Sequence, residues 1–378
     1  MIDRSGSMRG QRITQAKVAA TLAVEQLEPH DIVSIIAYDT EAELLVPATK
    51  VKDKEKLLQA IQAIEVAGST ALYAGTQLGG EQVRHYLDRE RVNRVILLSD
   101  GIANVGPSSV NDLYELGQSL GSEGIAVSTI GLGLGYNEDL MAQLAASSDG
   151  NHAFVEHPDQ LAHVMRQELK DALAVVAQDI KITVTFADGV YVKGSLGREA
   201  KIHSKSAVSR IKQMISKVER FVLLELEITP QLFALNPVTN NIKVADIRIE
   251  YLSLKGKKAI LYDTVIVSGA QDEQDQENST QAEVMASVVE LKARERETIA
   301  ISLKDAGKDD EAAAIMEESS QQLAQNAQRY RSKKLQIMSK KSKKDSVIMK
   351  RKGKGRAWKK SRKSMRQEAY SSKAQMAY

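Results

Sequence analysis

The residues best suited to chemistry lie at the start of the chain, in the string Asp3-Arg4-Ser5-Gly6-Ser7. The alternation Asp-x-Ser-x-Ser places one carboxylate and two hydroxyls on the same side of a tight loop, and Gly6 lets the backbone turn closely there. Three hard oxygen donors on one loop suit a small, hard cation such as Mg²⁺ or Mn²⁺. The spacing therefore indicates a candidate site for a divalent metal ion.

Two further oxygen donors stand at corresponding places later in the sequence. Thr70 comes directly before an expected helix at 71–88, and Asp100 follows an expected apolar strand at 94–98. In an open α/β sheet, the loops at the carboxyl ends of the strands form the ligand-binding edge. We therefore expect five side chains to converge at that edge: Asp3, Ser5, Ser7, Thr70 and Asp100.

The elements that must position these donors alternate between helix and strand patterns over residues 1–177. Short apolar, β-branched runs predict buried strands, and apolar residues repeating with helical period predict the helices between them. Such alternation is typical of a doubly wound, mainly parallel α/β sheet of Rossmann-like type. Helices are expected at 11–27, 53–64, 71–88, 110–123, 138–146 and 158–177, and strands at 31–38, 41–49, 94–98, 125–132 and 152–155.

The candidate donors resemble the metal-ion-dependent adhesion site (MIDAS) of von Willebrand factor type A (VWA) domains. Three segments carry the resemblance, in the order found in that family: Asp3-x-Ser5-x-Ser7, Thr70 and Ser99-Asp100-Gly101. The resemblance covers about residues 1–175 and implies a Mg²⁺ or Mn²⁺ ion held by the three hydroxyls, with the two carboxylates contacting it directly or through water. It also implies an open coordination position for an Asp or Glu carboxylate of a partner protein, and hence an interaction module of adhesion type.

One feature departs from that family pattern, because only Met1 and Ile2 precede Asp3. The family's first strand is an apolar run directly before this Asp, at the centre of the sheet, and losing it would cost an amount comparable with the roughly 5–15 kcal/mol that stabilises a domain. We therefore hypothesise a bacterial-type VWA-domain protein that is truncated at its N-terminus. As printed, the sequence lacks a signal peptide, as a cytoplasmic protein does. A missing N-terminal segment could have carried one, so no compartment is assigned.

Beyond residue 177 the pattern changes, and four further segments are expected. Period-two alternation at 179–186, 220–229, 241–251 and 258–268 predicts a small antiparallel β-rich domain over 178–270. A polar, acidic linker is expected at 271–279 and a helical hairpin at 280–332, with its turn near 305–307. The Lys, Ser and Gly content of residues 333–378 predicts a disordered basic tail.

Charge is divided unevenly along the chain. Residues 331–378 contain 18 Lys and Arg against two acids, Asp345 and Glu368, so they carry +16 while the preceding residues carry −13, within a total of +3. The basic tail could bind a polyanion, either nucleic acid or an anionic membrane, with Trp358 available for stacking or for an interface. A solubilising tail, or one that contacts the acidic body, is the alternative.

Motifs of common enzyme classes are missing from the sequence. The chain has no Cys, which excludes disulfide bonds and thiolate metal sites. It contains neither a GxxxxGK[ST] phosphate loop nor a GxSxG elbow. The six His residues form no metal-binding or triad motif, and His152 and His157 are expected at the surface. We therefore assign no catalytic or cofactor-binding residue, and we expect neither an enzyme nor a small-molecule substrate.

Overall fold

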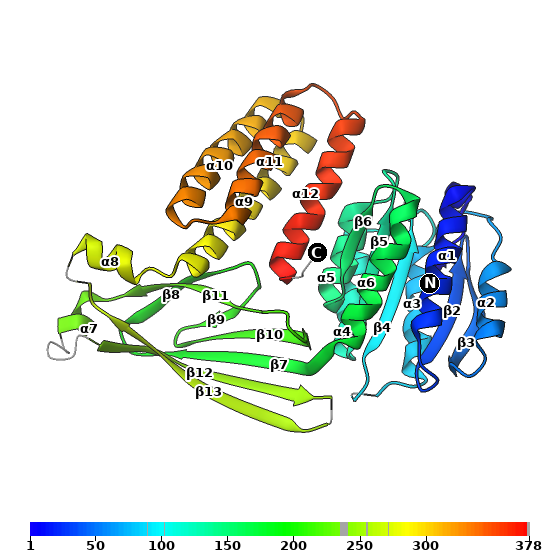
Figure 1. Ribbon diagram of the computed structural model, residues 1–378, viewed down its shortest axis with the longest axis horizontal. Coiled ribbons are helices and arrows are strands. Elements are labelled where there is room, and N and C mark those ends of the chain that lie inside the picture. The colour runs from blue at the N-terminus through cyan, green and yellow to red at the C-terminus, as the bar shows by residue number, and fades with distance from the viewer. Residues whose placement is uncertain (89, 102, 235–240, 255, 271, 376–378) are drawn as a thin grey trace. The chain divides into compact units, whose positions relative to one another are not determined.

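The computed structural model describes residues 1–88, 90–101, 103–234, 241–254, 256–270 and 272–375 (Figure 1). The chain divides into two compact units, described here one after the other. The N-terminal unit comprises Met1–Val176, Ile215–Lys217 and Leu254–Gly256. The C-terminal unit comprises Ala177–Met214, Val218–Ser253 and Lys257–Tyr378.

The N-terminal unit is built on a six-stranded sheet with the strand order β3-β2-β1-β4-β5-β6. Neighbouring strands are parallel except in the β2–β3 hairpin, which is antiparallel. The strands span Ile2–Asp3 (β1), Ile32–Tyr38 (β2), Ala42–Lys50 (β3), Asn93–Ser99 (β4), Ile125–Leu132 (β5) and His152–Val155 (β6). The predicted doubly wound, mainly parallel sheet is confirmed.

The helices of this unit begin and end within a few residues of the predicted bounds. Their starts follow from capping side chains: Asp53 accepts a hydrogen bond from the Lys56 amide, and Ser109 forms a capping box with Asp112. The helices are Gln11–Gln26 (α1), Lys54–Gln62 (α2), Leu72–Arg84 (α3), Val110–Ser122 (α4), Glu138–Ser148 (α5) and Leu161–Leu173 (α6), with 3₁₀ turns at Gly6–Met8 (η1) and Pro158–Gln160 (η2).

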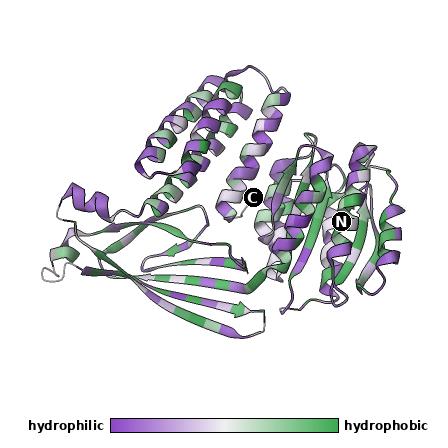
Figure 2. Ribbon diagram, in the orientation of Figure 1, coloured by the Kyte–Doolittle hydropathy of each residue, from purple (hydrophilic) through white to green (hydrophobic). Residues whose placement is uncertain are grey.

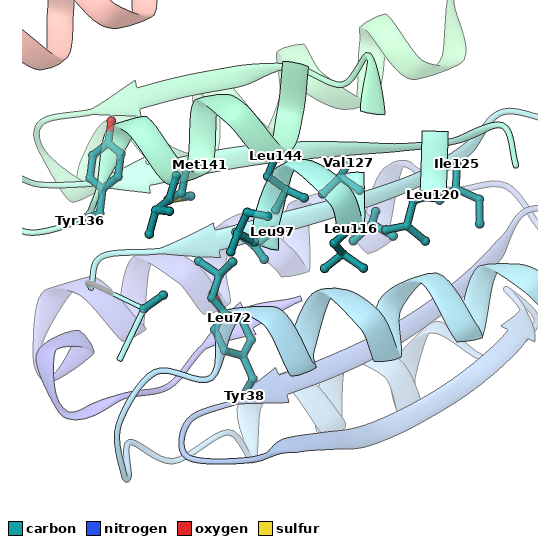
Figure 3. Close-up of a cluster of buried hydrophobic side chains, with 14 residues drawn as sticks. Tyr38, Leu72, Leu97, Leu116, Leu120, Ile125, Val127, Tyr136, Met141 and Leu144 are labelled. Atoms are coloured by element: carbon teal, nitrogen blue, oxygen red, sulfur yellow. The ribbon is translucent and has the colours of Figure 1, made fainter. Parts of the chain in front are cut away.

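Both faces of the sheet are covered by apolar side chains, which explains the continuous apolar strands in the sequence. Along β4, Leu97 packs into a cluster with residues of α3, α4 and α5, whereas Leu98 packs into a second cluster with residues of α1 and α6. Figure 3 shows the first cluster, where Leu72, Leu116 and Leu144 point toward the strands. Successive residues of the strand therefore pack against the helices on opposite faces of the sheet.

Strand β1 is short but lies at the centre of the sheet. Ile2 pairs with Ala37 of β2 and with Leu98 of β4, and Asp3 pairs with Tyr38. It contributes two residues, whereas β2 and β4 contribute seven each. This pairing fixes the loop after Asp3 between the ends of two well-buried strands.

The β-rich part of the C-terminal unit contains more strands than the sequence predicted. A five-stranded sheet has the order β13-β12-β7-β10-β9, and β11 pairs with β8 in a separate two-stranded sheet. The strands β8, β9 and β10 were not predicted, because polar and basic residues obscure the alternation of their buried positions. The strands are Val175–Phe186 (β7), Val190–Leu196 (β8), Lys201–His203 (β9), Ser206–Ile215 (β10), Leu223–Ile228 (β11), Asn241–Ser253 (β12) and Lys258–Ser268 (β13), and Pro230–Ala234 is a short helix (α7).

The helical part of the C-terminal unit corrects two predictions. The hairpin is present, as Ala282–Asp305 (α9) and Asp309–Arg329 (α10), but the expected linker contains a short helix, Glu273–Ser279 (α8), capped by Asp272. Gln271 lies outside the described residues. The predicted disordered tail is wrong up to residue 375, because it forms two helices, Lys333–Lys350 (α11) and Arg356–Ala374 (α12), beside α9 and α10 (Figure 1).

The tail folds because many of its sparse apolar residues face the interior of the helical bundle, although Ile337 and Val347 are exposed. Met349, Trp358 and Met365 are each at most 3% exposed and pack against α9 and α10. Most other residues of α11 and α12 are hydrophilic, as the colouring in Figure 2 shows, so mean composition hides this amphipathic pattern. None of the helices that the structure describes is both long and apolar enough to cross a membrane.

Candidate metal centre

Four of the five predicted donors are joined through hydrogen bonds at the carboxyl-terminal edge of the central strands. The Ser5 and Ser7 hydroxyl oxygens lie 3.1 Å apart, and the Ser7 hydroxyl donates to Asp100 Oδ1 at 2.7 Å. The Ser5 amide donates to Asp3 Oδ1 at 2.8 Å. The loops after β1 and β4 thus bring together side chains almost 100 residues apart in sequence.

The hydroxyl of Thr70 joins this cluster around Gly101. A methyl group built onto Gly101 would place its carbon 3.1 Å from Thr70 Oγ1, 3.4 Å from Ser7 Oγ and 3.8 Å from Ser5 Oγ. Three hydroxyl oxygens therefore surround a space that a side chain at position 101 would fill. Oxygen donors converging on a small space fit a hard divalent cation such as Mg²⁺ or Mn²⁺.

Backbone hydrogen bonds between loops hold these donors in place. The Gly6 amide donates to the Gly68 carbonyl at 3.1 Å, and the Arg4 amide donates to the Tyr38 carbonyl at 2.9 Å. The Thr70 amide donates to the Asn104 side-chain oxygen at 2.8 Å. Gly68 has a φ of +59°, a left-handed conformation that favours glycine and brings its carbonyl to the first loop.

The two carboxylates are buried and carry an unbalanced negative charge. Asp3 is 0% exposed and Asp100 is 1% exposed. Burial raises the pKa of Asp3, hydrogen bonds from Ser5 and Ser99 lower it, and the charge of Asp100 raises it again. Arg12 is the cation that contacts this pair among the described residues. Because buried charge is costly unless it is compensated, the pair favours an additional cation.

This constellation is rich in hydroxyls rather than in acids. The described residues contain no group of three or more Asp, Glu or His side chains placed to hold a metal ion. Two carboxylates and three hydroxyls leave such a site with less negative charge than an all-carboxylate cage. A bound dication would therefore keep an affinity for another anionic oxygen.

Two contributors to the site were given no role from the sequence, although Ser99 belongs to the motif quoted there. Ser99 donates to Asp3 Oδ2 at 2.6 Å, and Arg12 pairs with Asp100. Nothing in the local spacing marks Arg12, since its partner is 88 residues away. The expected surface position of His152 is wrong: its ring is fully buried and its Nδ1 lies 2.8 Å from Thr129 Oγ1, because β5 and its neighbouring helix enclose β6. His157 is exposed.

An open groove lies beside the segment that carries Thr70 and the loop after β4. It has a volume of about 360 Å³, and its lining includes Ala71, which follows Thr70, Val105 and, from the turn between β2 and β3, Thr40. Glu41 and Glu81 also line it. A partner that reached the donor cluster would therefore find an adjoining concave surface on this unit.

Comparison with known proteins identifies the fold of this unit. Residues 1–167 match the family model of the von Willebrand factor type A domain. The chain is 28% identical over 188 residues to the uncharacterized protein YfbK of Escherichia coli, and 30% identical over 167 residues to the uncharacterized protein sll0103 of Synechocystis. These matches cover 49% and 44% of this chain, but only 33% and 39% of the two relatives.

A solved structure extends the similarity beyond the matched domain. A von Willebrand factor type A protein from Catenulispora acidiphila superposes with a TM-score of 0.71 at 14% sequence identity, covering 88% of this chain and 80% of the other. At that identity the likeness concerns the fold alone.

Proposed function

Because residues 1–167 form a von Willebrand factor type A domain, we propose that the N-terminal unit binds a partner protein in a manner that depends on Mg²⁺ or Mn²⁺. The observation that carries this proposal is the convergence of three hydroxyls and two buried carboxylates around Gly101. No chemical transformation is part of it. The residues proposed to hold the ion are Asp3, Ser5, Ser7, Thr70 and Asp100.

The partner is proposed to present an Asp or Glu side chain. When bound, the ion would supply a Lewis-acidic coordination position for a carboxylate oxygen. Ser7 is exposed while Ser5 and Thr70 are buried, so the side of the cluster that carries Ser7 is open to a partner. The adjoining groove of about 360 Å³ offers further contact area on the same face of the unit.

Capture of a partner under controlled metal content tests this function. The immobilised full chain should retain the partner from a crude extract in millimolar Mg²⁺ and release it in EDTA. Asp100→Asn should abolish retention, whereas Asp159→Asn, which changes an exposed carboxylate elsewhere in the unit, should leave it intact. Retention that is equal in EDTA, or equal in Asp100→Asn, would contradict the proposal.

A second candidate function, polyanion binding, concerns helices α11 and α12. Nine Lys and Arg side chains are exposed between residues 343 and 360, and the single acid in that stretch, Asp345, is buried. Trp358 is 3% exposed, so it is not available to stack on a base. The exposed charges of α11 and α12 therefore favour contact with phosphate groups, on nucleic acid or on an anionic membrane.

Salt dependence separates the two candidates. Binding through α11 and α12 should weaken steeply with ionic strength and should not change in EDTA. Binding through the metal site should be lost in EDTA and should depend less on ionic strength. Substituting Lys343, Lys344, Lys359 and Lys360 with Gln removes charge while keeping the buried residues of the bundle. If retention of DNA or anionic vesicles survives these substitutions, the second candidate fails.

A further inference from the structure

Among the described residues, one cation contacts the candidate metal site, and it reaches the site from solvent. Arg12, the second residue of α1, contacts Asp100 Oδ2 through Nη1 and donates to the Ser7 carbonyl at 3.1 Å. The Asp100 side chain is 0% exposed, whereas the Arg12 side chain is 37% exposed. A long, partly solvated side chain therefore neutralises a fully buried carboxylate.

Every carboxylate oxygen of the cluster already accepts a hydrogen bond. Asp3 accepts from the Ser5 amide and the Ser99 hydroxyl, and Asp100 accepts from the Ser7 hydroxyl and Arg12. Three of these donors are neutral groups, and hydroxyl donors can rotate so that their oxygens become ligands. Arg12 is different, because a guanidinium has no acceptor and cannot lose its proton.

We propose that Arg12 is an exchangeable counter-ion that competes with the divalent cation for Asp100, and so sets the metal concentration at which the site loads. This inference depends on the proposed function, since it concerns the same site. A guanidinium and a dication repel each other at contact distance, and both need Asp100 Oδ2 or the space beside it. Arg12 therefore stabilises the metal-free unit and weakens metal binding.

Direct titration with Mn²⁺ tests the competition. Binding of Mn²⁺ to the full chain is followed by the electron paramagnetic resonance signal of the free ion in wild type, Arg12→Gln and Arg9→Gln. Arg9 lies three residues away, is exposed and forms no ion pair with the described residues, so its substitution controls for loss of general positive charge. Arg12→Gln should lower the Kd for Mn²⁺ about tenfold or more, because the ion no longer has to displace a charge-assisted hydrogen bond from Asp100. Arg9→Gln should change it less than about threefold.

Thermal unfolding in EDTA provides a second test, in which the variant that binds Mn²⁺ more tightly should be less stable. Without metal, Arg12→Gln should lower the Tm relative to Arg9→Gln, because buried Asp100 loses its counter-charge. Tighter metal binding combined with a less stable metal-free state cannot arise from simple damage to the fold. Arg12→Lys keeps the charge and should hold the Mn²⁺ affinity near that of wild type, which provides a folded variant if Arg12→Gln is too unstable.

The outcomes distinguish this inference from the function on which it depends. If wild type binds Mn²⁺ and Arg12→Gln binds it equally or more weakly, Arg12 is not a competitor and the inference is overturned while the metal site stands. If Arg12→Lys binds Mn²⁺ as tightly as Arg12→Gln does, the competition is not electrostatic and the inference is also overturned. If wild type binds no Mn²⁺ at millimolar concentration, both the site and the inference fail.

Discussion

Each unit of the chain contains a cluster of buried charged side chains, and these two clusters are neutralised differently. In the N-terminal unit, Asp3 and Asp100 are surrounded by hydroxyls and contacted by one partly exposed cation, Arg12. In the C-terminal unit, Arg294 and Glu297 are 8% and 4% exposed and form an ion pair of 2.7 Å within α9. The first cluster is open to exchange, and the second is closed.

The closed cluster provides its own cations on rigid helices. Glu368 of α12 accepts from Arg294 at 3.0 Å and also pairs with Lys341 of α11. Asp345 accepts from the Ser361 hydroxyl at 2.6 Å. The cavity among these side chains has a volume of about 20 Å³, room for roughly one water molecule. This cluster therefore has no space for an external ligand and specifies how α9, α11 and α12 pack.

The comparison shows that buried acids alone do not define a binding site. In both units burial raises the pKa of a carboxyl group, Asp3 in one and Glu297 in the other. The difference lies in whether the compensating charge belongs to the fold or can come from outside. Four predictions test this distinction: three substitutions in order of expected size, and then a pH dependence.

Removing the central cation of the closed cluster should have the largest effect. Arg294→Ala leaves buried Glu297 and partly exposed Glu368 without their shared partner and should lower the free energy of unfolding by roughly 3–5 kcal/mol. Urea denaturation followed by circular dichroism measures the loss. Arg296→Ala, on the same helix but paired with Glu318 at 3.9 Å and partly exposed, should cost about 0–1 kcal/mol. Equal losses of unfolding free energy in Arg294→Ala and Arg296→Ala would show that the buried cation matters no more than a partly exposed one.

Filling the space around Gly101 should abolish the metal response without unfolding the domain. The methyl group of Gly101→Ala would meet the hydroxyl oxygens of Thr70 and Ser7. Wild type should gain about 2.7 kcal/mol of unfolding free energy when Mg²⁺ is at 100 times its Kd, and the variant should gain almost none. Gly6→Ala is the matched control, since its methyl group would meet only the Gly68 carbonyl oxygen at 3.7 Å. A full Mg²⁺ response in Gly101→Ala would place the ion elsewhere.

Neutralising Asp3 should have opposite effects on stability with and without metal. Burial raises the pKa of Asp3, which means that folding makes its ionised form less favourable than it is in water. Asp3→Asn should therefore raise the Tm in EDTA by roughly 2–4 °C, the shift expected for 1 kcal/mol in a domain of this size. It should also remove the stabilisation by Mg²⁺. A lower Tm in EDTA would mean that the charge of Asp3 stabilises the metal-free fold.

The closed cluster should show a modest pH dependence that Glu297→Gln removes. Burial raises the pKa of Glu297 to about 7 from an ordinary 4.5, so the folded state binds a proton that the unfolded state has released between these values. Stability conferred by this proton is present below pH 4.5 and is lost as pH rises through 7, with a slope of at most about 1.4 kcal/mol per pH unit. The unfolding free energy of wild type minus that of Glu297→Gln, measured from pH 4.5 to 8, should fall with pH. A flat difference would show that Glu297 is ionised throughout.

Much of the N-terminal unit could be predicted because its signals are local. The apolar runs that became β4 and β5 and the cap at Asp53 appear within a few residues of sequence. Four candidate donors could be found because they follow a strand, and parallel strands bring their carboxyl ends to one edge, whereas Thr70 was marked by its position just before a helix. Their role in binding metal is still a prediction that the experiments above address.

The parts that escaped prediction depend on contacts across long stretches of chain. Residues 333–374 resemble a disordered segment in composition, yet Trp358 and Met365 are buried against α9 and α10. The contact between Arg12 and Asp100 joins helix α1 to the loop after β4, which no local pattern links. Such features follow from tertiary packing rather than from propensity.

The central claim is that one divalent ion is held by Asp3, Ser5, Ser7, Thr70 and Asp100. The most direct test is isothermal titration calorimetry of Mg²⁺, and separately of Mn²⁺, into the present chain after its metal has been removed with EDTA, alongside Asp100→Asn. We predict one ion bound per chain in wild type and no binding by Asp100→Asn at the same concentrations. Undetectable binding to a cooperatively folded wild type, or unchanged binding to Asp100→Asn, would contradict the claim.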